Sequence, residues 1–320
     1  MRKFVSGLLA ATVSLALASC GPGDSSDSQS AQADPGPVRV LTTFYPTTYF
    51  AQRIVDGLAE GEAEVVCPVP VGADPIFWQP TAQDIGLYQG ADLIVLNGAG
   101  FERWAANAAI PASRVVDSAA GFASQFIMIQ SKTHSHGPDG DHTHEGLDGH
   151  TWLDPINAME QSRAIHDALA ALLPEHAQTL RANLDTLLDN LRKLDARLTA
   201  FAEKNRGTRL VASHPAYNYL GRRYQWALVS LDLDPSVPLT DGQIEEIRQA
   251  GLPTSGRASV MLWESEPIDA IRARLESEFG TPMVVFSPVE MLSPERLANG
   301  EDYLTVMHAN IERLEAALNP

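Results

Sequence analysis

Residues 174–204 read PEHAQTLRANLDTLLDNLRKLDARLTAFAEK, and this stretch decides the fold. Leucines between Leu180 and Leu198 recur mainly at spacings of three and four residues, which predicts a helix with one apolar face. The helix is expected to run from Glu175 to about Lys204 and to end at Gly207. Roughly 30 residues at about 1.5 Å each make a rod of about 45 Å. Because such a rod is longer than an ordinary lobe is wide, it predicts a rigid connection between two lobes.

Segments that resemble strands and helices alternate on both sides of this rod. Runs rich in apolar and β-branched residues predict strands at 38–44, 64–69, 92–96 and 114–117, and again at 209–213, 227–231, 259–263 and 283–286. Helical segments are expected between them, with further helices at 157–173 (Asn157 as N-cap) and 303–318. This alternation predicts an α/β fold in which each lobe has a small, mostly parallel sheet flanked by helices. The expected boundaries are 38–174, 175–206 for the linking helix, and 207–320.

The N-terminus carries the features of an export signal. Two basic residues, Arg2 and Lys3, precede an apolar run, which predicts a signal peptide over 1–19. The run ends in Leu-Ala-Ser-Cys, which resembles the lipobox of bacterial lipoproteins and implies that Cys20 carries a lipid. Residues 20–37 are polar and small, as in a flexible tether. We therefore expect an extracytoplasmic protein anchored to a membrane by its lipid; a plain secretory signal is the alternative.

Composition excludes several classes of function. The formal net charge of −17 makes nucleic acid an improbable partner, because phosphate contacts need Lys and Arg. With Cys20 lipidated, Cys67 is the one thiol left, so neither a disulfide framework nor a thiolate zinc cluster is expected. The chain has no His-Glu-x-x-His or Gly-x-Ser-x-Gly motif, and we predict that it is not an enzyme. A monomer is expected.

Five of the nine histidines lie in residues 133–150, THSHGPDGDHTHEGLDGH. The composition of this stretch predicts a solvated loop without a core. Three interpretations stay open: a metal site, a collector of metal beside a site, or a polar loop that is rich in histidine by chance. Paired histidines bind zinc weakly even in a disordered segment, so a solvated loop does not exclude metal capture.

Polar residues that follow predicted strands mark a second candidate site, because ligands bind at the carboxyl ends of strands in open α/β sheets. His150 follows the histidine-rich loop, His214 follows the strand at 209–213, and Glu264 follows the strand at 259–263. Asp74-Pro75 follows the strand at 64–69. Imidazole and carboxylate are the ligands that zinc accepts in proteins, usually four in a tetrahedron.

The chain resembles the periplasmic metal-binding proteins of zinc and manganese uptake transporters. The resemblance covers the chain from about residue 38 onward and rests on an ordered series of motifs: Asp74-Pro75, GADLIVLNG (90–98) with FERW (101–104), HTWLDP (150–155), SHPAYNYL (213–220) and DYL (302–304). The family implies two α/β lobes joined by a long rigid helix. It also implies that His150 and His214 are metal ligands, and zinc-type members tend to carry a histidine-rich acidic loop.

Two positions depart from the family pattern. The family usually has a metal-binding histidine directly after Asp-Pro, where this chain has Ile76, and often an aspartate after the final strand, where it has Ser287. Isoleucine cannot bind a metal, and serine is a poor zinc ligand. Glu264 is the nearest replacement, with Glu266 and Glu290 ranked below it. A further hypothesis is that the loop lends a histidine, His142 or His144; deletion of 133–147 without effect on affinity would remove it.

The predicted function is capture of a divalent transition metal between the lobes and its delivery to an ABC-type permease. Zinc is favoured and Mn²⁺ is the alternative, because imidazole ligands suit zinc and Mn²⁺ prefers oxygen. The alternative functions are a metal-buffering or metal-delivering lipoprotein without a transporter, and a diverged member with another cargo. Because histidine ligands must be neutral, affinity is expected to fall below about pH 6.

Overall fold

The structure is a computed structural model that describes residues 36–129, 133–135, 141–143, 146–252 and 259–318. Residues 36–320 form one compact unit. The predicted signal peptide, Cys20 and the tether up to residue 35 lie outside the described residues. In the part of the chain that is described, every helix is too short or too polar to cross a bilayer.

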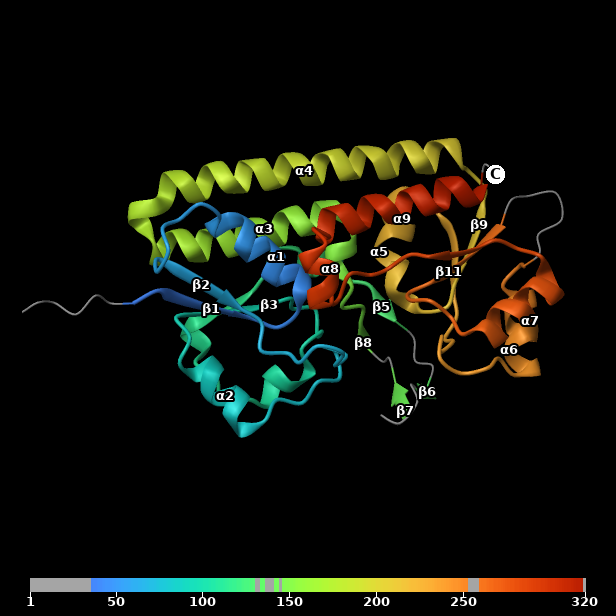
Figure 1. The fold of residues 1–320 in the computed structure, drawn as a ribbon, viewed down its shortest axis with the longest axis horizontal. Helices are drawn as coiled ribbons and strands as arrows, with labels where there is room; N and C mark the ends of the chain where they lie inside the picture. Colours follow the sequence, from blue (N-terminus) through green and yellow to red (C-terminus); the bar gives the residue numbers. More distant parts are fainter. Residues whose placement is uncertain (1–35, 130–132, 136–140, 144–145, 253–258, 319–320) are drawn as a thin grey trace, which may run out of the picture. The chain divides into compact units, whose positions relative to one another are not determined.

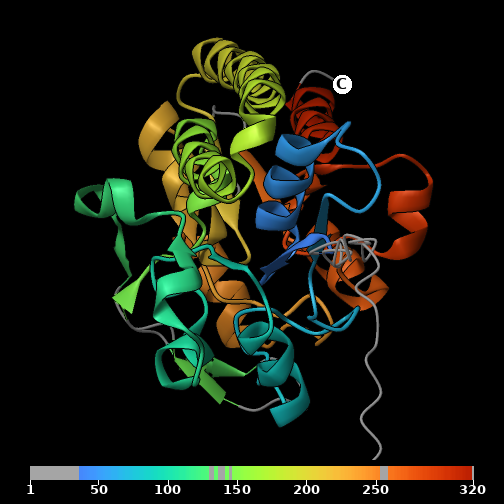
Figure 2. The same ribbon diagram turned by 90° about the vertical axis from the view of Figure 1, so that its left-hand side faces the viewer.

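Each half of the chain builds a four-stranded parallel sheet (Figures 1 and 2). The first contains β1 (Val38–Thr42), β2 (Ala63–Val66), β3 (Leu93–Leu96) and β4 (Val115–Asp117) in the order β2-β1-β3-β4. The second contains β9 (Arg209–Ala212), β10 (Ala227–Ser230), β11 (Ser259–Trp263) and β12 (Met283–Val285) in the order β10-β9-β11-β12. The strand order therefore reverses between β1 and β3 and again between β9 and β11. Ligand crevices form outside the carboxyl ends of strands at such points.

Helices cover both sheets. The first half supplies α1 (Tyr45–Val55), α2 (Ala82–Gln89) and α3 (Pro155–Leu172). The second supplies α5 (Asn218–Tyr224), α6 (Asp241–Gln249), α7 (Asp269–Phe279), α8 (Pro294–Ala298) and α9 (Tyr303–Leu318). This architecture confirms the predicted α/β fold with two lobes.

The long helix α4 (Ala177–Lys204) lies against both lobes (Figure 1). It contacts α1 and α3 in the first half and α5 and α9 in the second. Its leucines from Leu180 to Leu198 are buried, and one continuous core cluster contains residues of β1, β3, α4, β9, β11 and α9. The predicted rod is thus part of a shared core. The residue boundaries predicted for the lobes and the linker remain a prediction.

Two local expectations were wrong. The N-cap of α3 is Asp154, whose carboxylate accepts a hydrogen bond from the Ile156 amide at 2.9 Å, and Asn157 is buried inside the helix. Pro155 explains the shift, because proline fits the first turn of a helix. The helix expected between the strands at 92–96 and 114–117 is replaced by short 3-10 turns, the first of them Arg103–Asn107. Here the Glu102 carboxylate accepts hydrogen bonds from the Asn97 and Gly98 amides and closes the loop instead.

The histidine-rich stretch contains more regular structure than its composition predicts. At its base β5 (Met128–Ile129) pairs with β8 (Gly146–Leu147), and β6 (Thr133–Ser135) pairs with β7 (Asp141–Thr143), both antiparallel. His134 lies opposite His142 in this register. His136 and His144 lie outside the described residues.

Candidate metal site between the two lobes

His150 is held by hydrogen bonds near the end of β3 in the first sheet. Its Nδ1 is 2.8 Å from Asp148 Oδ1, and its backbone amide donates to the same oxygen at 2.9 Å. Asn97, which directly follows β3, donates to the Gly149 carbonyl at 2.8 Å and accepts from the Thr151 hydroxyl at 3.1 Å. Both neighbours of His150 are therefore tied to a strand end, and the buried imidazole directs Nε2 toward Glu290 of the second half.

His214 and Glu264 follow the two central strands of the second sheet. His214 comes after β9 and Glu264 directly after β11, at the point where the strand order reverses. The His214 side chain is buried, and its Nδ1 is 4.0 Å from Glu264 Oε2. The ring of His214 lies 5.6 Å from the ring of His150, measured between centroids. The fold thus brings together two histidines that are 64 positions apart in the sequence.

Glu290, ranked below Glu264 from the sequence, lies close to His150. Its Oε1 lies 3.2 Å from His150 Nε2. Two atoms bound to one tetrahedral zinc ion at about 2.0–2.1 Å would be roughly 3.3 Å apart, so this pair already has the spacing of two ligands. The Tyr45 amide donates to the Glu290 carbonyl at 3.1 Å and fixes the residue from the first half of the chain.

A strained turn directs Glu290 toward His150. Val289 is buried and has φ 63°, a left-handed conformation that β-branched residues avoid. The Trp152 indole donates to the Pro288 carbonyl at 2.7 Å, and the Ser287 hydroxyl accepts from the Val289 amide at 3.2 Å. The Ser287 hydroxyl therefore helps to shape the turn.

His214, Glu264 and Glu290 line a pocket of about 780 Å³, and His150 is buried next to Glu290. Its wall includes Asp74, Ile76, His214, Glu264, Ser287 and Glu290. Asp74 Oδ1 accepts from the Ile76 amide at 2.9 Å, the same turn that Asp148 makes with His150. Ile76 thus occupies a position equivalent to that of His150 but offers only an alkyl group, and it is 8% exposed.

The pocket concentrates negative charge. Burial, and then the Glu290 carboxylate, raise the pKa of Glu264 to about 8. The same two causes raise the pKa of Asp74 to about 6. Burial acts to lower the pKa of His150, but its hydrogen bonds with Asp148 and Glu290 outweigh burial and raise that pKa to about 10. A bound cation would relieve the repulsion among the carboxylates and take the place of the protons.

The four groups form two close pairs, His150 with Glu290 and His214 with Glu264, and not yet one coordination sphere. Holding one ion among them requires small movements of side chains.

The other predicted site residues are less informative. Glu266 lines the pocket but pairs with Arg272, and its side chain is 69% exposed. His142 is placed only by its register on β7, and His144 lies outside the described residues.

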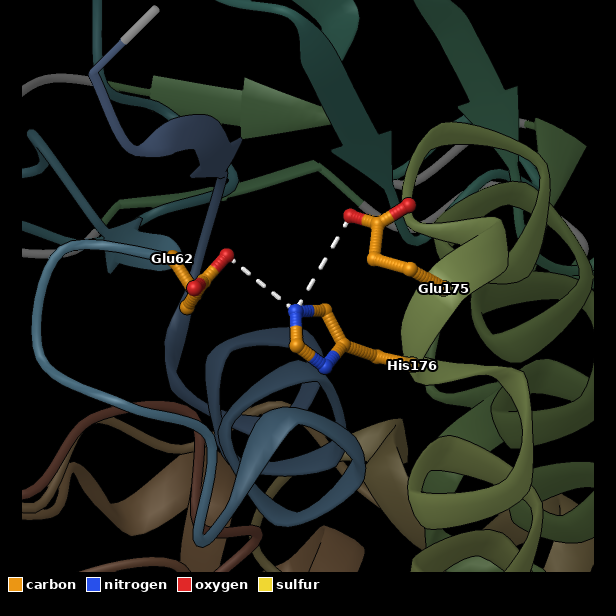
Figure 3. A group of neighbouring side chains, drawn as sticks. All are labelled: Glu62, Glu175 and His176. Carbon is orange, nitrogen blue, oxygen red and sulfur yellow. Dashed lines mark hydrogen bonds and ion pairs between the residues drawn. The ribbon is translucent and has the colours of Figure 1, made fainter. Parts of the chain in front are cut away.

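A separate cluster lies away from this pocket, at the start of α4 (Figure 3). His176 Nε2 is 3.1 Å from Glu62 Oε2 and 3.9 Å from Glu175 Oε1, and the ring lies between the two carboxylates. Of the described residues, these three are close enough to one another to share an ion. The glutamate side chains are 42% and 59% exposed, as expected for a surface ion pair.

Comparison with known proteins identifies the family of this chain. Residues 40–317 match the family model described as zinc-uptake complex component A, periplasmic. The chain belongs to this family. Membership in the zinc-uptake family confirms the predicted class, a metal-binding component of a transport system rather than an enzyme.

Sequence identity to individual relatives is low, but the similarity extends over nearly the whole chain. The chain is 27% identical to the high-affinity zinc uptake system protein ZnuA of Bacillus subtilis, over 99% of each chain. It is 26% identical to the zinc-binding lipoprotein AdcA of Streptococcus pneumoniae R6, over 98% of this chain but only 60% of AdcA. The chain therefore spans well under two thirds of that relative's length.

Solved structures show the same fold. The metal-dependent lipoprotein YcdH of Bacillus subtilis has a TM-score of 0.73 at 24% identity, covering 88% of this chain and 99% of that one. The Zn(II)-bound ZnuA-like domain of S. pneumoniae AdcA has a TM-score of 0.73 at 22% identity, with 89% and 100% covered. The FpvC protein of Pseudomonas aeruginosa, in complex with Mn²⁺, has a TM-score of 0.67 at 21% identity, with 88% and 98% covered.

Proposed function

We propose that this member of the zinc-uptake family captures one divalent transition metal ion between its lobes, with His150, His214, Glu264 and Glu290 as ligands. The observation that carries the proposal is the meeting of two buried imidazoles, 5.6 Å apart, beside a group of mutually repelling carboxylates. Asp148 occupies Nδ1 of His150, so Nε2 is the atom that binds. The loop residues His142 and His144 remain proposed as collectors of metal or as an extra ligand.

Zinc is the proposed cargo. Two imidazoles with carboxylates form a donor set that zinc accepts, and the names of ZnuA and AdcA describe zinc uptake and zinc binding. Mn²⁺ is the second candidate, because the carboxylates of Asp74, Glu264 and Glu290 in the pocket wall offer the oxygen ligands that manganese prefers.

We further propose that the protein is anchored outside the cytoplasm through a lipid on Cys20 and passes its metal to an ABC permease. Support comes from the Leu-Ala-Ser-Cys sequence, from the family description as a periplasmic component of zinc uptake, and from lipoprotein relatives. Growth of a deletion strain under zinc limitation tests delivery. Wild-type protein should restore growth, and the His214→Ala variant should not. Equal rescue by both would favour a different cargo.

Zinc titration of the full chain against a chelator of known affinity tests the site itself. We expect one tight site in the wild type and its loss in His150→Ala and in His214→Ala. His308→Ala is the matched control, because His308 lies on α9, outside the pocket lining. Weak, multiple binding that ignores His214 and depends on residues 133–147 would show that the loop alone holds metal.

A further inference from the structure

Asn218, at the start of α5, connects the two proposed metal-binding histidines. Its Nδ2 donates to Asp148 Oδ2 at 2.9 Å and to the Pro215 carbonyl at 3.0 Å. Asp148 holds the imidazole of His150, and Pro215 directly follows His214. One side-chain amide therefore joins the support of one histidine to the backbone of the other, across the two halves of the chain.

The orientation of this amide is determined by its partners. A carboxylate oxygen and a backbone carbonyl both accept hydrogen bonds, so only the NH₂ group can serve the two of them. The Asn218 oxygen then faces the Ser230 hydroxyl, which donates to it at 3.4 Å from the end of β10. All three contacts are satisfied in this single orientation, and the side chain is anchored to the second sheet.

Asp148 lies at the centre of the arrangement. It is fully buried, and its Oδ1 serves His150 while its Oδ2 serves Asn218. The Tyr219 hydroxyl also donates to the Asp148 carbonyl at 2.9 Å. The carboxylate that orients His150 is therefore itself oriented by α5, an element of the opposite half. Partners of this kind behind a metal-binding histidine fix its tautomer and its direction.

We propose that Asn218 is a positioning residue that sets the spacing of His150 and His214 for metal binding. This inference rests on the proposed function. Asn218 does not bind the ion; it keeps Asp148 and the His214–Pro215 backbone in register, so that both imidazoles point at one ion. Without Asn218, both halves of the chain keep their proposed ligands, but the distance between His150 and His214 is no longer fixed.

The test compares zinc affinity in two asparagine variants of the full chain. Asn218→Ala should weaken zinc binding by about 10- to 100-fold, as loss of partners behind metal ligands does. Asn183→Ala is the matched control. Asn183 Nδ2 also donates two hydrogen bonds, to the Ile54 and Asp56 carbonyls at 2.9 and 2.7 Å, and also joins elements distant in sequence, but it lies away from the pocket. The control should bind zinc as the wild type does.

A second readout separates positioning from general stability. The visible absorption of bound Co²⁺ reports ligand geometry, and it should change in Asn218→Ala and stay the same in Asn183→Ala. Thermal unfolding of the metal-free proteins should show similar small losses in both variants. Equal affinity losses in both variants, or wild-type affinity and an unchanged Co²⁺ spectrum in Asn218→Ala, would overturn the proposal.

His214→Ala, measured in parallel, separates this inference from the proposed function. If His214→Ala abolishes tight binding while Asn218→Ala has no effect, the site stands and the role of Asn218 is wrong. If His214→Ala also binds zinc normally, the site between the lobes is wrong, and the inference about Asn218 fails with it.

Discussion

A single side chain decides how many ligands the first lobe offers. Asp74 and Ile76 repeat the turn that Asp148 and His150 make, with the aspartate accepting from the amide two residues later in each case. At the second turn the outcome is an imidazole backed by a carboxylate. At the turn of Asp74 and Ile76 it is an alkyl group in the wall of the pocket that Glu264 and Glu290 also line. At Ile76 the backbone therefore has the conformation that supports a metal-binding histidine elsewhere in the site, but the side chain has no nitrogen to bind a metal.

Substitution of Ile76 by histidine should supply that donor. We expect Ile76→His to raise zinc affinity at least about tenfold, equivalent to about 1.4 kcal/mol, with Asp74 available to orient the new ring. Chelator competition measures the change. Val71→His is the control, because Val71 lies in the same segment but is 65% exposed and outside the pocket lining. Unchanged affinity in Ile76→His would contradict the equivalence of the two turns.

Protons compete for the same site. The pKa of His150 is raised to about 10 and that of Glu264 to about 8, so both groups carry a proton at pH 7 without metal. Zinc binding must displace these protons, and we expect about one to two to be released per ion. Affinity should therefore keep rising from pH 6 to pH 8, beyond the limit near pH 6 expected from ordinary histidines.

Calorimetry in two buffers with different ionisation enthalpies measures this proton release. The observed enthalpy of zinc binding should differ between the buffers in proportion to the protons released. His150→Ala offers a comparison in which one source of protons is missing. Identical enthalpies for the wild-type protein in both buffers would show that no proton leaves, and that the raised pKa values do not govern binding.

At the scale of elements, strand ends were predictable and turn geometry was not. Glu264 directly follows β11 and His214 lies two residues after β9, so strand prediction alone placed them. Glu290 lies beyond the end of β12 and reaches the site because Val289 adopts a left-handed conformation. A valine in the sequence does not indicate such a conformation. Asn218 lies in the SHPAYNYL motif, but nothing in the sequence separates its role from that of an ordinary cap near the start of a helix. Its two acceptors come from different parts of the chain.

The histidine-rich segment is the element whose contribution is easiest to isolate. His134, His136, His142 and His144 lie within residues 133–147, whereas the four proposed ligands, including His150 at the end of the histidine-rich stretch, lie outside that range. Replacing these four histidines by asparagine leaves the length of the segment unchanged and keeps it polar. We expect the tight site to keep its affinity and additional weak zinc binding to disappear, as measured by titration beyond one equivalent. A large loss of affinity at the first equivalent would show that the loop lends a ligand.

At the scale of the whole molecule, the shared core limits how the two lobes behave. The apolar cluster extends from β1 through α4 to β11 and α9, and α4 contacts helices of both halves. Leu191, on α4, is fully buried in this cluster. Leu191→Ala should therefore cost about 2–5 kcal/mol of unfolding free energy and destabilise both halves together. Calorimetry should show one lower transition; two separated transitions would mean that each lobe has an independent core.

Metal binding should stabilise this one unit by mass action. With zinc at about 100 times its dissociation constant, linkage predicts about 2.7 kcal/mol of added stability, since the ligands meet only in the folded state. The wild-type unfolding temperature should rise with zinc concentration and stay a single transition, because the ion binds residues of both halves. His214→Ala should lose this shift, while Leu191→Ala should keep it from a lower starting temperature. That contrast separates a damaged core from a damaged site: a zinc response that disappears in Leu191→Ala would show that metal binding depends on the packing of α4 as well as on the ligands.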